Sequence, residues 1–482
     1  MINQLEWIRD VIYDYIYFTK KDDSKYTSEK QIIDSPWFQR LRRILQLQSS
    51  WMVFPNAVHS RFLHSLGTMQ LAGTLAGQLY PFFKEAFPGE YIPEEKNHVI
   101  EIFRIAGLLH DIGHAPLGHL IDDIYTYKLY HKTHEDISCR IITQELGEII
   151  KKIRISPEGP FEKEIDPELI IKFVKLPKNF KGYALWEQVF SKIMFGVYSV
   201  DTIDFLLRDK YFTGIREVGD INYVNLFNQS FISDRGLTLK KAGLSNLHSL
   251  LSIRLAMFKN VYFNEKKIII EKSLARLLPD IFKILKLGDP TKNLDKFLLL
   301  DDFSLMTHIR GWNTEKKGVK KELSQEWLKI FDRRDIFFKK IFEKEKYYYE
   351  FINKNHIMNN DELTTKLKKI LKDKEFTVSH DILDVRNQNL FLHAIKKEKI
   401  QETDNTRSVG LYDEGTGKFL SKDDESIMAD IPLKYSVLRI FADKDSNIST
   451  LGEKEIQDSQ LELELENEQI NENKGRTEIT NV

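Results

Sequence analysis

The sequence predicts a mainly α-helical fold with a smaller C-terminal lobe that mixes helices and strands (α+β). Through most of residues 31–285, apolar residues recur at the three- and four-residue spacing of an amphipathic helix, most clearly over 62–80 and 189–212. Prolines such as Pro81 should end helices in this part. Short runs of β-branched and aromatic residues appear in 376–440, which is typical of strands. Because the helical spacing covers the longer part of the chain, helices should supply most of the core.

The first residues differ from the helical part that follows. In the N-terminal segment, residues 1–30, apolar side chains alternate loosely from Val11 to Phe18, which predicts a β-hairpin or strand. Ser35 and Pro36 then predict the start of a helix, because serine caps helix N-termini and proline fits the first helical position.

The C-terminal part divides into a lobe and a tail. Residues 286–442 form the lobe. The helical amphipathicity of 290–370, including the lysine- and aromatic-rich run from Lys339 to Tyr349, predicts a second, smaller lobe or an interface. Residues 443–482 form an acidic polar tail with few large apolar side chains, which we expect to order only against a partner.

Composition limits the class of protein. Of the 482 residues, 42% are hydrophobic and 30% are charged, as in soluble globular proteins. The chain has 71 basic and 72 acidic residues, so its net charge is close to zero. Nucleic acid could therefore bind only at a local basic patch. The single cysteine excludes an intrachain disulfide, and no apolar run is long enough to span a membrane or to resemble a secretory signal. We therefore expect a cytoplasmic protein without membrane attachment.

Histidines cluster in one stretch of the helical part. Eight of the thirteen lie between His59 and His134, and His110 is directly followed by Asp111 at the end of an apolar helix. Adjacent helical residues point about 100° apart, so this pair can share one ion only near a helix end or a distortion. Imidazole and carboxylate donors suit a divalent metal such as Mn²⁺, Fe²⁺, Zn²⁺, Ni²⁺ or Mg²⁺, and the sequence does not select among them. The alternative is that the pair only caps the helix.

Three further histidines are candidates for proton transfer. His114, His119 and His134 follow the His–Asp pair closely, and an unperturbed imidazole titrates near neutrality. Asp122 and Glu135 are the carboxylates that could raise the pKa of these imidazoles. The alternative for each histidine is a structural hydrogen bond.

Four parts of the sequence form a recognisable set: 33–42, 54–67, 105–114, and the group Asp201, Asp204, Phe205, Arg208 and Asp209. Through them the sequence resembles the deoxynucleoside triphosphate (dNTP) triphosphohydrolases of the animal sterile-alpha-motif/HD type and their bacterial relatives. The similarity runs from about Asp10 to Ala275. The resemblance implies a helical HD-domain phosphohydrolase fold and a reaction that releases a deoxynucleoside and intact triphosphate. Since the resemblance to the HD region starts near residue 10, no sterile-alpha-motif domain is expected before it.

The resemblance also implies roles for individual residues. The implied metal ligands, in an H…HD…D pattern, are His64, His110, Asp111 and Asp201. The residues implied to handle the triphosphate and its protons are His114, His119 and His134, with Asp122 and Glu135 behind them. The other implied substrate contacts are Arg61 to the phosphates, Gln46 and Asp209 to the sugar 3′-hydroxyl, Phe205 against the sugar, and Arg254 and Tyr262 elsewhere on the nucleotide.

A second implied site is regulatory. Asp34, Gln39 and Arg42 match the positions that read an activating guanine nucleotide, and the residues that match contacts to a second activator are Lys240 and Asn246. The resemblance thus implies a homo-oligomer, a dimer or tetramer, that nucleotides assemble. The alternative is that these are solvated surface residues.

Several positions depart from the family pattern. Thr202 stands where the family has a phosphate-binding lysine, and Phe205 replaces a tyrosine. Asn264 and Glu265 replace a histidine and a lysine, so positive charge is lost while the metal ligands stay intact. Two alternatives therefore remain. One is an HD phosphohydrolase that acts on another phosphoester, such as a nucleoside monophosphate, a modified nucleotide or an alarmone. The other is a nucleotide-sensing or nucleic-acid-binding scaffold.

Overall fold

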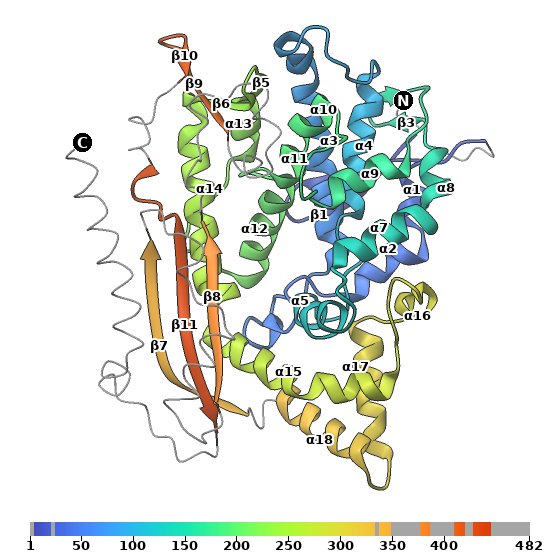
Figure 1. Ribbon diagram of the computed structural model, residues 1–482, viewed down its shortest axis with the longest axis vertical. Coiled ribbons are helices and arrows are strands. Elements are labelled where there is room, and N and C mark those ends of the chain that lie inside the picture. Colours follow the sequence, from blue (N-terminus) through green and yellow to red (C-terminus); the bar gives the residue numbers. More distant parts are fainter. Residues whose placement is uncertain are drawn as a thin grey trace.

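Helices dominate the structure, as predicted (Figure 1). The computed structural model describes residues 4–20, 25–332, 337–348, 376–385, 409–419 and 428–444. Two long helices, α3 (Arg61–Ala86) and α4 (Lys96–Leu109), pack against each other, and α12 (Val200–Thr213) packs on α3. These three helices carry the site described below.

The other elements are mostly short. Further helices in the described residues are α1 (Glu29–Ile33), α2 (Pro36–Arg40), α5 (His119–Ile121), α6 (Lys128–Tyr130), α7 (His134–Gln144), α8 (Gly147–Lys151), α9 (Pro167–Val174), α10 (Leu185–Phe190), α11 (Lys192–Phe195), α13 (Tyr223–Asn228), α14 (Leu244–Met257), α15 (Glu265–Leu285), α16 (Leu294–Leu298), α17 (Asp302–Gly311) and α18 (Val319–Phe331). The strands are β1 (Leu5–Asp10), β2 (Asp14–Thr19), β3 (Ile155–Ser156), β4 (Gly159–Pro160), β5 (Ser230–Ser233), β6 (Gly236–Lys240), β7 (Phe338–Tyr348), β8 (Phe376–Asp384), β9 (Gly410–Asp413), β10 (Lys418–Phe419) and β11 (Lys434–Asp443). Among the helices that the structure describes, none combines the length and the apolar character needed to cross a membrane.

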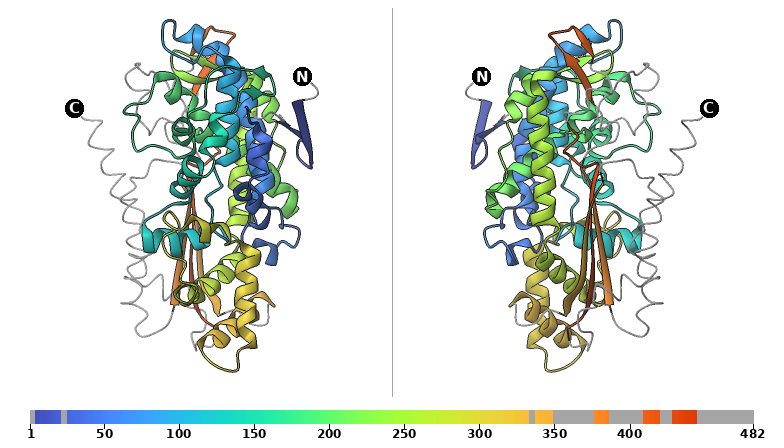
Figure 2. Two further views of the ribbon diagram at one scale, coloured as in Figure 1. Left: turned by 90° about the vertical axis from the view of Figure 1, so that its right-hand side faces the viewer. Right: turned by 90° about the vertical axis from the view of Figure 1, so that its left-hand side faces the viewer.

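The N-terminal elements form where the sequence indicates. β1 and β2 pair as an antiparallel hairpin, which Figure 2 shows at the edge of the molecule. Helix α2 begins at Pro36, and the Ser35 hydroxyl accepts a hydrogen bond from the backbone N–H of Phe38, as expected of an N-cap.

Two sheets join the C-terminal residues to the helical part. In the antiparallel order β7-β11-β8, the first sheet packs beside α15, where Phe441 contacts Ile268 and Ile269. In the second sheet, ordered β10-β9-β6-β5, β9 pairs in parallel with β6. One hydrophobic cluster extends from Ile16 to Val437. The proposed boundary at residue 286 therefore does not divide two separate cores, and the domain limits stay a prediction.

Three local predictions are wrong. The run with helical spacing that begins at Lys339 lies in strand β7, which pairs along β11. Strand β11 is buried over almost its whole length, so the backbone groups along its edges need hydrogen-bond partners. This tertiary pairing overrides the local helical spacing. Pro81 lies inside α3 and does not end it. The single helical pattern over 189–212 is broken into α10, α11 and α12. The acidic tail after residue 444 lies outside the described residues.

Candidate metal and active site

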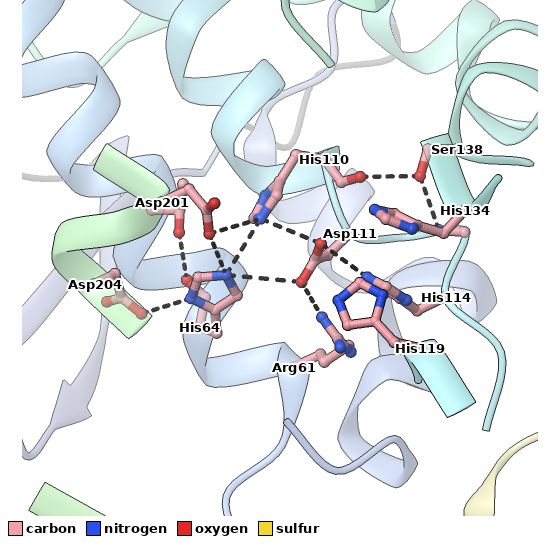
Figure 3. A network of polar contacts seen from close by, with 12 residues as sticks. Arg61, His64, His110, Asp111, His114, His119, His134, Ser138, Asp201 and Asp204 are labelled. Carbon is pink, nitrogen blue, oxygen red and sulfur yellow. Dashed lines mark hydrogen bonds and ion pairs between the residues drawn. The ribbon is translucent and has the colours of Figure 1, made fainter. Parts of the chain in front are cut away.

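Three chain segments bring the implied metal ligands together (Figure 3). His64 lies in the first turn of α3, Asp201 in the first turn of α12, and His110 and Asp111 directly after α4. Because α4 ends at Leu109, two adjacent residues can turn their side chains toward one point, as the sequence predicts.

The ligand atoms converge closely. His64 Nε2 lies 3.1 Å from Asp201 Oδ1, 3.2 Å from His110 Nε2 and 3.7 Å from Asp111 Oδ2. His110 Nε2 lies 3.3 Å from Asp111 Oδ1 and 3.6 Å from Asp201 Oδ1. Ligand atoms of His64, His110 and Asp201 all lie within 4.8 Å of one another, and Asp111 adds a carboxylate beside both imidazoles. Imidazole nitrogens and carboxylates are a donor set for a divalent metal ion, so the residues present fit the cation that the pattern implies.

The charge of the site favours a cation as well. Burial lowers the pKa of His64, but hydrogen bonds to Asp201 and Asp204 outweigh it and raise that pKa to about 10. Burial opposes ionisation of Asp111, yet the adjacent His110 helps to hold the pKa of this carboxyl well below its usual range. The carboxylates therefore stay ionised, and they attract positive charge to the point where the imidazoles meet.

A second layer of contacts orients the ligands. His64 Nδ1 donates to Asp204 Oδ2 at 2.7 Å, and Arg208 donates to both oxygens of Asp204 at 3.0 and 2.9 Å. Asp10 of the N-terminal hairpin accepts from the other side of Arg208 at 2.7 Å. His110 Nδ1 donates to a backbone carbonyl of α4 at 2.9 Å. Both histidines thus keep Nε2 for a metal, which is the usual purpose of such outer contacts.

These outer contacts were not predicted from the sequence. Asp204 and Arg208 belong to one of the motifs that carry the resemblance, but no role was predicted for them. A signal was present, because their three- and seven-residue spacing from Asp201 places all three on one face of a helix. The contact to Asp10 had no local signal.

Gly67 must stay small for this layer to form. A Cβ at Gly67 would overlap Asp204 Oδ1 and lie 2.7 Å from Arg208 Nη2. We expect Gly67→Ala to lower the free energy of unfolding by roughly 2–4 kcal/mol and to weaken metal binding, because it displaces a buried ion pair. Chemical denaturation and metal titration test this. Gly311→Ala is the control, since a Cβ there meets no atom within 4 Å; equal stability of both variants would contradict the expectation.

The three candidate proton-transfer histidines also lie together. His114 Nδ1 donates to the buried Asp122 Oδ2 at 2.7 Å, and the rings of His114 and His134 stack at 3.8 Å. Nδ1 of His119 lies 3.8 Å from the same carboxylate oxygen. Glu135 Oε1 lies 3.6 Å from His134 Nε2. The implied catalytic residues therefore form one cluster beside the metal ligands.

Burial and neighbouring charges lower the pKa of all three imidazoles below the near-neutral value of an unperturbed imidazole. Burial and the Arg61 charge lower the pKa of His114 to about 4, and burial with the neighbouring His114 lowers that of His134 to about 4. The pKa of His119 is lowered in the same direction by desolvation and by His114, although 61% of its side-chain area is exposed and water weakens the shift. All three are neutral in the free protein at pH 7.

A cavity of about 800 Å³ opens over both groups. The residues on its wall that the resemblance assigns are Gln46, Arg61, His64, His110, Asp111, His114, His119, His134, Glu135, Asp201, Phe205, Asp209 and Tyr262. Asp122 lies behind the histidines, and Arg254 is absent from the cavity wall that the described residues form. The structure thus gathers most of the implied residues around one cavity.

The charge of the cavity differs from the expectation. Thr202 hydrogen-bonds Ser199 at 2.9 Å and does not belong to the wall, and Glu265 pairs with Lys340 at 2.6 Å. Helix α15, however, places two lysines on the wall, Lys267 and Lys272, which the sequence analysis did not identify. Their five-residue spacing on an otherwise ordinary amphipathic helix gave no signal.

The implied regulatory residues lie away from the cavity wall. Arg42 donates to Gln39 at 2.8 Å and covers the ring of Phe62, while Asp34 pairs with Lys30 at 2.6 Å. The second group is separate: Lys240 pairs with Glu414 at 2.8 Å, and Asn246 is half-buried on α14. The structure brings the first three residues into one region but leaves their role a prediction.

Part of the chain matches a known family. Residues 61–174 match the HD domain family model. The chain is 29% identical over 329 residues to a putative HD domain-containing protein of Acanthamoeba polyphaga mimivirus, covering 66% of this chain and 68% of that protein. It is 27% identical over 416 residues to the deoxynucleoside triphosphate triphosphohydrolase SAMHD1 homolog of Dictyostelium discoideum, covering 85% of this chain and 73% of that protein.

The fold has a counterpart among solved structures. A phosphohydrolase from Bacteroides thetaiotaomicron is similar with a TM-score of 0.62 and 21% identity, covering 91% of this chain and 100% of that one. Residues 61–174 therefore match an HD domain, and the chain is similar over most of its length to the Dictyostelium SAMHD1 homolog.

Proposed function

We propose that the chain is a divalent-metal-dependent phosphohydrolase that converts dNTPs to a deoxynucleoside and intact triphosphate. The observation that carries the proposal is the complete set of His64, His110, Asp111 and Asp201 on the wall of a cavity of about 800 Å³. A cavity of this size accommodates a nucleotide-sized ligand. The name of the Dictyostelium relative supports the choice of substrate.

The metal ligands and Arg61 form the phosphate end of the cavity. A divalent metal held by the four ligands would act as a Lewis acid and lower the pKa of a bound water. Arg61 pairs with Asp111 through Nη1, and its Nε has no hydrogen-bond partner among the described residues. That N–H group and the guanidinium charge suit a phosphate oxygen of the substrate.

The leaving group needs a proton. The bond that breaks joins the α-phosphorus to the 5′-oxygen, which departs as an alkoxide. His114 is committed to Asp122 through Nδ1, and its Nε2 lies 3.3 Å from Asp111 Oδ1. His119 and His134 are therefore the better proton donors, because both lie on the cavity wall and their carboxylate contacts are longer than those of His114.

The sugar end is built around one carboxylate. Asp209 Oδ2 accepts from the Tyr262 hydroxyl at 2.7 Å, and Oδ1 accepts from His59 Nε2 at 2.7 Å. These contacts hold Asp209 where it can accept from a sugar 3′-hydroxyl. Gln46 is on the same cavity wall, and Phe205 lies near the Tyr262 ring, where it can pack against the sugar.

The pH dependence of hydrolysis tests the acid role. A histidine that protonates the leaving group must carry a proton, and the pKa values of about 4 for His114 and His134 leave such groups neutral in the free protein at pH 7. A bound triphosphate stabilises the imidazolium and raises its pKa. We expect the high-pH limb of kcat to lie about one pH unit or more above that of kcat/KM, because kcat/KM reports the free protein. Coincident limbs between pH 4 and pH 9 would contradict this role.

The direct test of the reaction is product analysis. The purified protein is incubated with Mn²⁺ or Mg²⁺ and each dNTP, and the products are separated by ion-exchange chromatography. Deoxynucleoside with intact triphosphate supports the proposal. No turnover of any dNTP by protein that holds its metal would reject the dNTP substrate.

A second candidate is hydrolysis of another phosphoester by the same metal site. The cavity wall also carries Asp123, Glu271 and Asp381, which repel a highly charged triphosphate, while Lys267 pairs with Glu271 at 2.9 Å. A nucleoside monophosphate, a modified nucleotide or an alarmone carries a different negative charge and so needs a different number of cationic side chains on the wall. Turnover of one of these, faster than of every dNTP, would favour this candidate.

Activation by guanine nucleotide belongs to the proposal as well. Arg42 and Gln39 are hydrogen-bonded to each other beside the exposed Asp34, so charged and amide groups are available to a purine. We expect added GTP or dGTP to raise dNTP hydrolysis and to shift the protein to a dimer or tetramer. Light scattering with size-exclusion chromatography, with and without GTP, measures the second effect.

A further inference from the structure

We propose that helix α17, through Asp302, is a positioning element of the active site that holds the turn presenting His119 to the cavity. This inference rests on the proposed function. It adds to the active site a segment outside the HD-domain match of residues 61–174. In Figure 1, α17 lies below α5, the short helix that begins with His119.

The turn before His119 has an unfavourable backbone. Leu117 has φ 53°, and Gly118 has φ 48° with ψ −130°, so both residues lie in the positive-φ region. Glycine adopts this region readily, but the Cβ of a leucine is crowded by its own backbone there. A Cβ at Gly118 would also approach Arg61 Nη2 to 3.0 Å. Such a turn persists only where surrounding contacts hold it.

Asp302 supplies the contact at the strained residue. Its Oδ1 accepts from the backbone N–H of Leu117 at 2.6 Å, and its Oδ2 accepts from the backbone N–H of Leu45 at 2.7 Å. Asp302 is only 7% exposed, so water does not replace these bonds readily.

The two bonds reach both sides of the cavity. Leu117 is two residues before His119, a candidate proton donor, and Leu45 is directly before Gln46, a candidate sugar contact. One buried carboxylate therefore fixes the distance between two parts of the wall that are far apart in sequence. That is the arrangement expected of a positioning residue rather than of a residue that touches substrate.

A second link joins the same segment to the catalytic histidines. The buried Arg40 donates through Nη2 to the carbonyl of His114 at 2.9 Å and through Nε to the carbonyl of Leu300 at 2.8 Å. Its guanidinium lies 4.5 Å from the ring of Phe297, on α16. Arg40 thus links Leu300, just before α17, to His114 at the start of the turn, and Asp302 binds the turn at Leu117.

The test is Asp302→Ala in the full chain, followed by hydrogen–deuterium exchange of the peptide that covers residues 112–121. We expect exchange in this peptide to accelerate about tenfold or more, because a strained turn loses its anchor. Metal content should stay that of the wild type, since no ligand is touched. For the substrate that the wild type hydrolyses, kcat should fall about tenfold or more while KM changes little.

Two further variants control for a general loss of stability. Ser304→Ala removes the hydroxyl that accepts from the Asp301 backbone at 2.8 Å, so it weakens the start of α17 without touching the turn. Asp302→Asn keeps one acceptor oxygen and should give intermediate exchange; it replaces Asp302→Ala if that variant does not fold.

The outcomes are distinguishable. Unchanged exchange over 112–121 in the Asp302 variants would overturn the positioning role, and so would equal effects of Ser304→Ala on exchange and kcat. Faster local exchange confined to the Asp302 variants supports the role. If that result is accompanied by a wild type that hydrolyses no phosphoester, the proposed function fails while the link between α17 and the turn stands.

Discussion

The double variant His110→Ala/Asp111→Ala is expected to lose both its metal and its hydrolytic activity. His110 Nε2 and Asp111 supply half of the converging donor set, and His64 with Asp201 alone leaves too few ligands for tight binding. Loss of Asp111 also leaves Arg61 without its buried partner. Metal content is measured by mass spectrometry after gel filtration, and hydrolysis by chromatography of the products.

His98→Ala is the matched control for this double variant. His98 is a buried histidine in the first turn of α4, with Nε2 3.2 Å from the carbonyl of Glu164, and it has no place on the cavity wall. It should lose stability and keep its metal. Full hydrolytic activity of the double variant would contradict the metal mechanism.

Asp204→Asn is expected to weaken metal binding by about 10- to 100-fold without removing a ligand. Asp204 accepts from His64 Nδ1 at 2.7 Å, which leaves Nε2 of the same ring to face the other ligands. An amide can turn its NH₂ group toward His64, and then the imidazole loses its fixed proton position. Competition between the protein and a chelator of known affinity measures the change.

Asp10→Asn separates this effect from a loss of stability. Asp10 binds the same Arg208 from the other side at 2.7 Å, yet it does not contact His64. Both variants weaken a buried ion pair, so both should unfold at lower denaturant concentration. Only Asp204→Asn should bind metal more weakly; an equal loss in Asp10→Asn would show that the effect comes from stability.

The position of His110 and Asp111, two of the proposed metal ligands, could be predicted from the sequence because the signals are local. The helical spacing that ends near Leu109 places His110 and Asp111 at a helix end, and the structure has that end at the same residue. The N-cap at Ser35 was predictable for the same reason, since a serine followed by a proline marks a helix start within two residues.

The remaining features depend on contacts between distant segments. Asp10 reaches Arg208, and Asp302 reaches Leu117, across separations that no spacing rule covers. Strand β7 was misjudged because its alternation is hidden by lysines and aromatic residues, and only the presence of β11 decides its conformation. The lowered pKa values of the three candidate proton-transfer histidines likewise arise from their crowding in the folded chain.

The parallel pairing of β6 with β9 has a consequence for how the chain reaches its native state. Thr238 and Leu239 pair with Gly410 and Leu411, and Lys241 contacts Asp413, 172 residues later. During synthesis, β6 must therefore wait for a partner that emerges much later from the ribosome, and its backbone groups stay open to other chains meanwhile. A fragment cut after α15 would carry every proposed metal ligand and still expose that open edge, so poor solubility of such a fragment would reflect an incomplete sheet rather than a defect in the proposed active site.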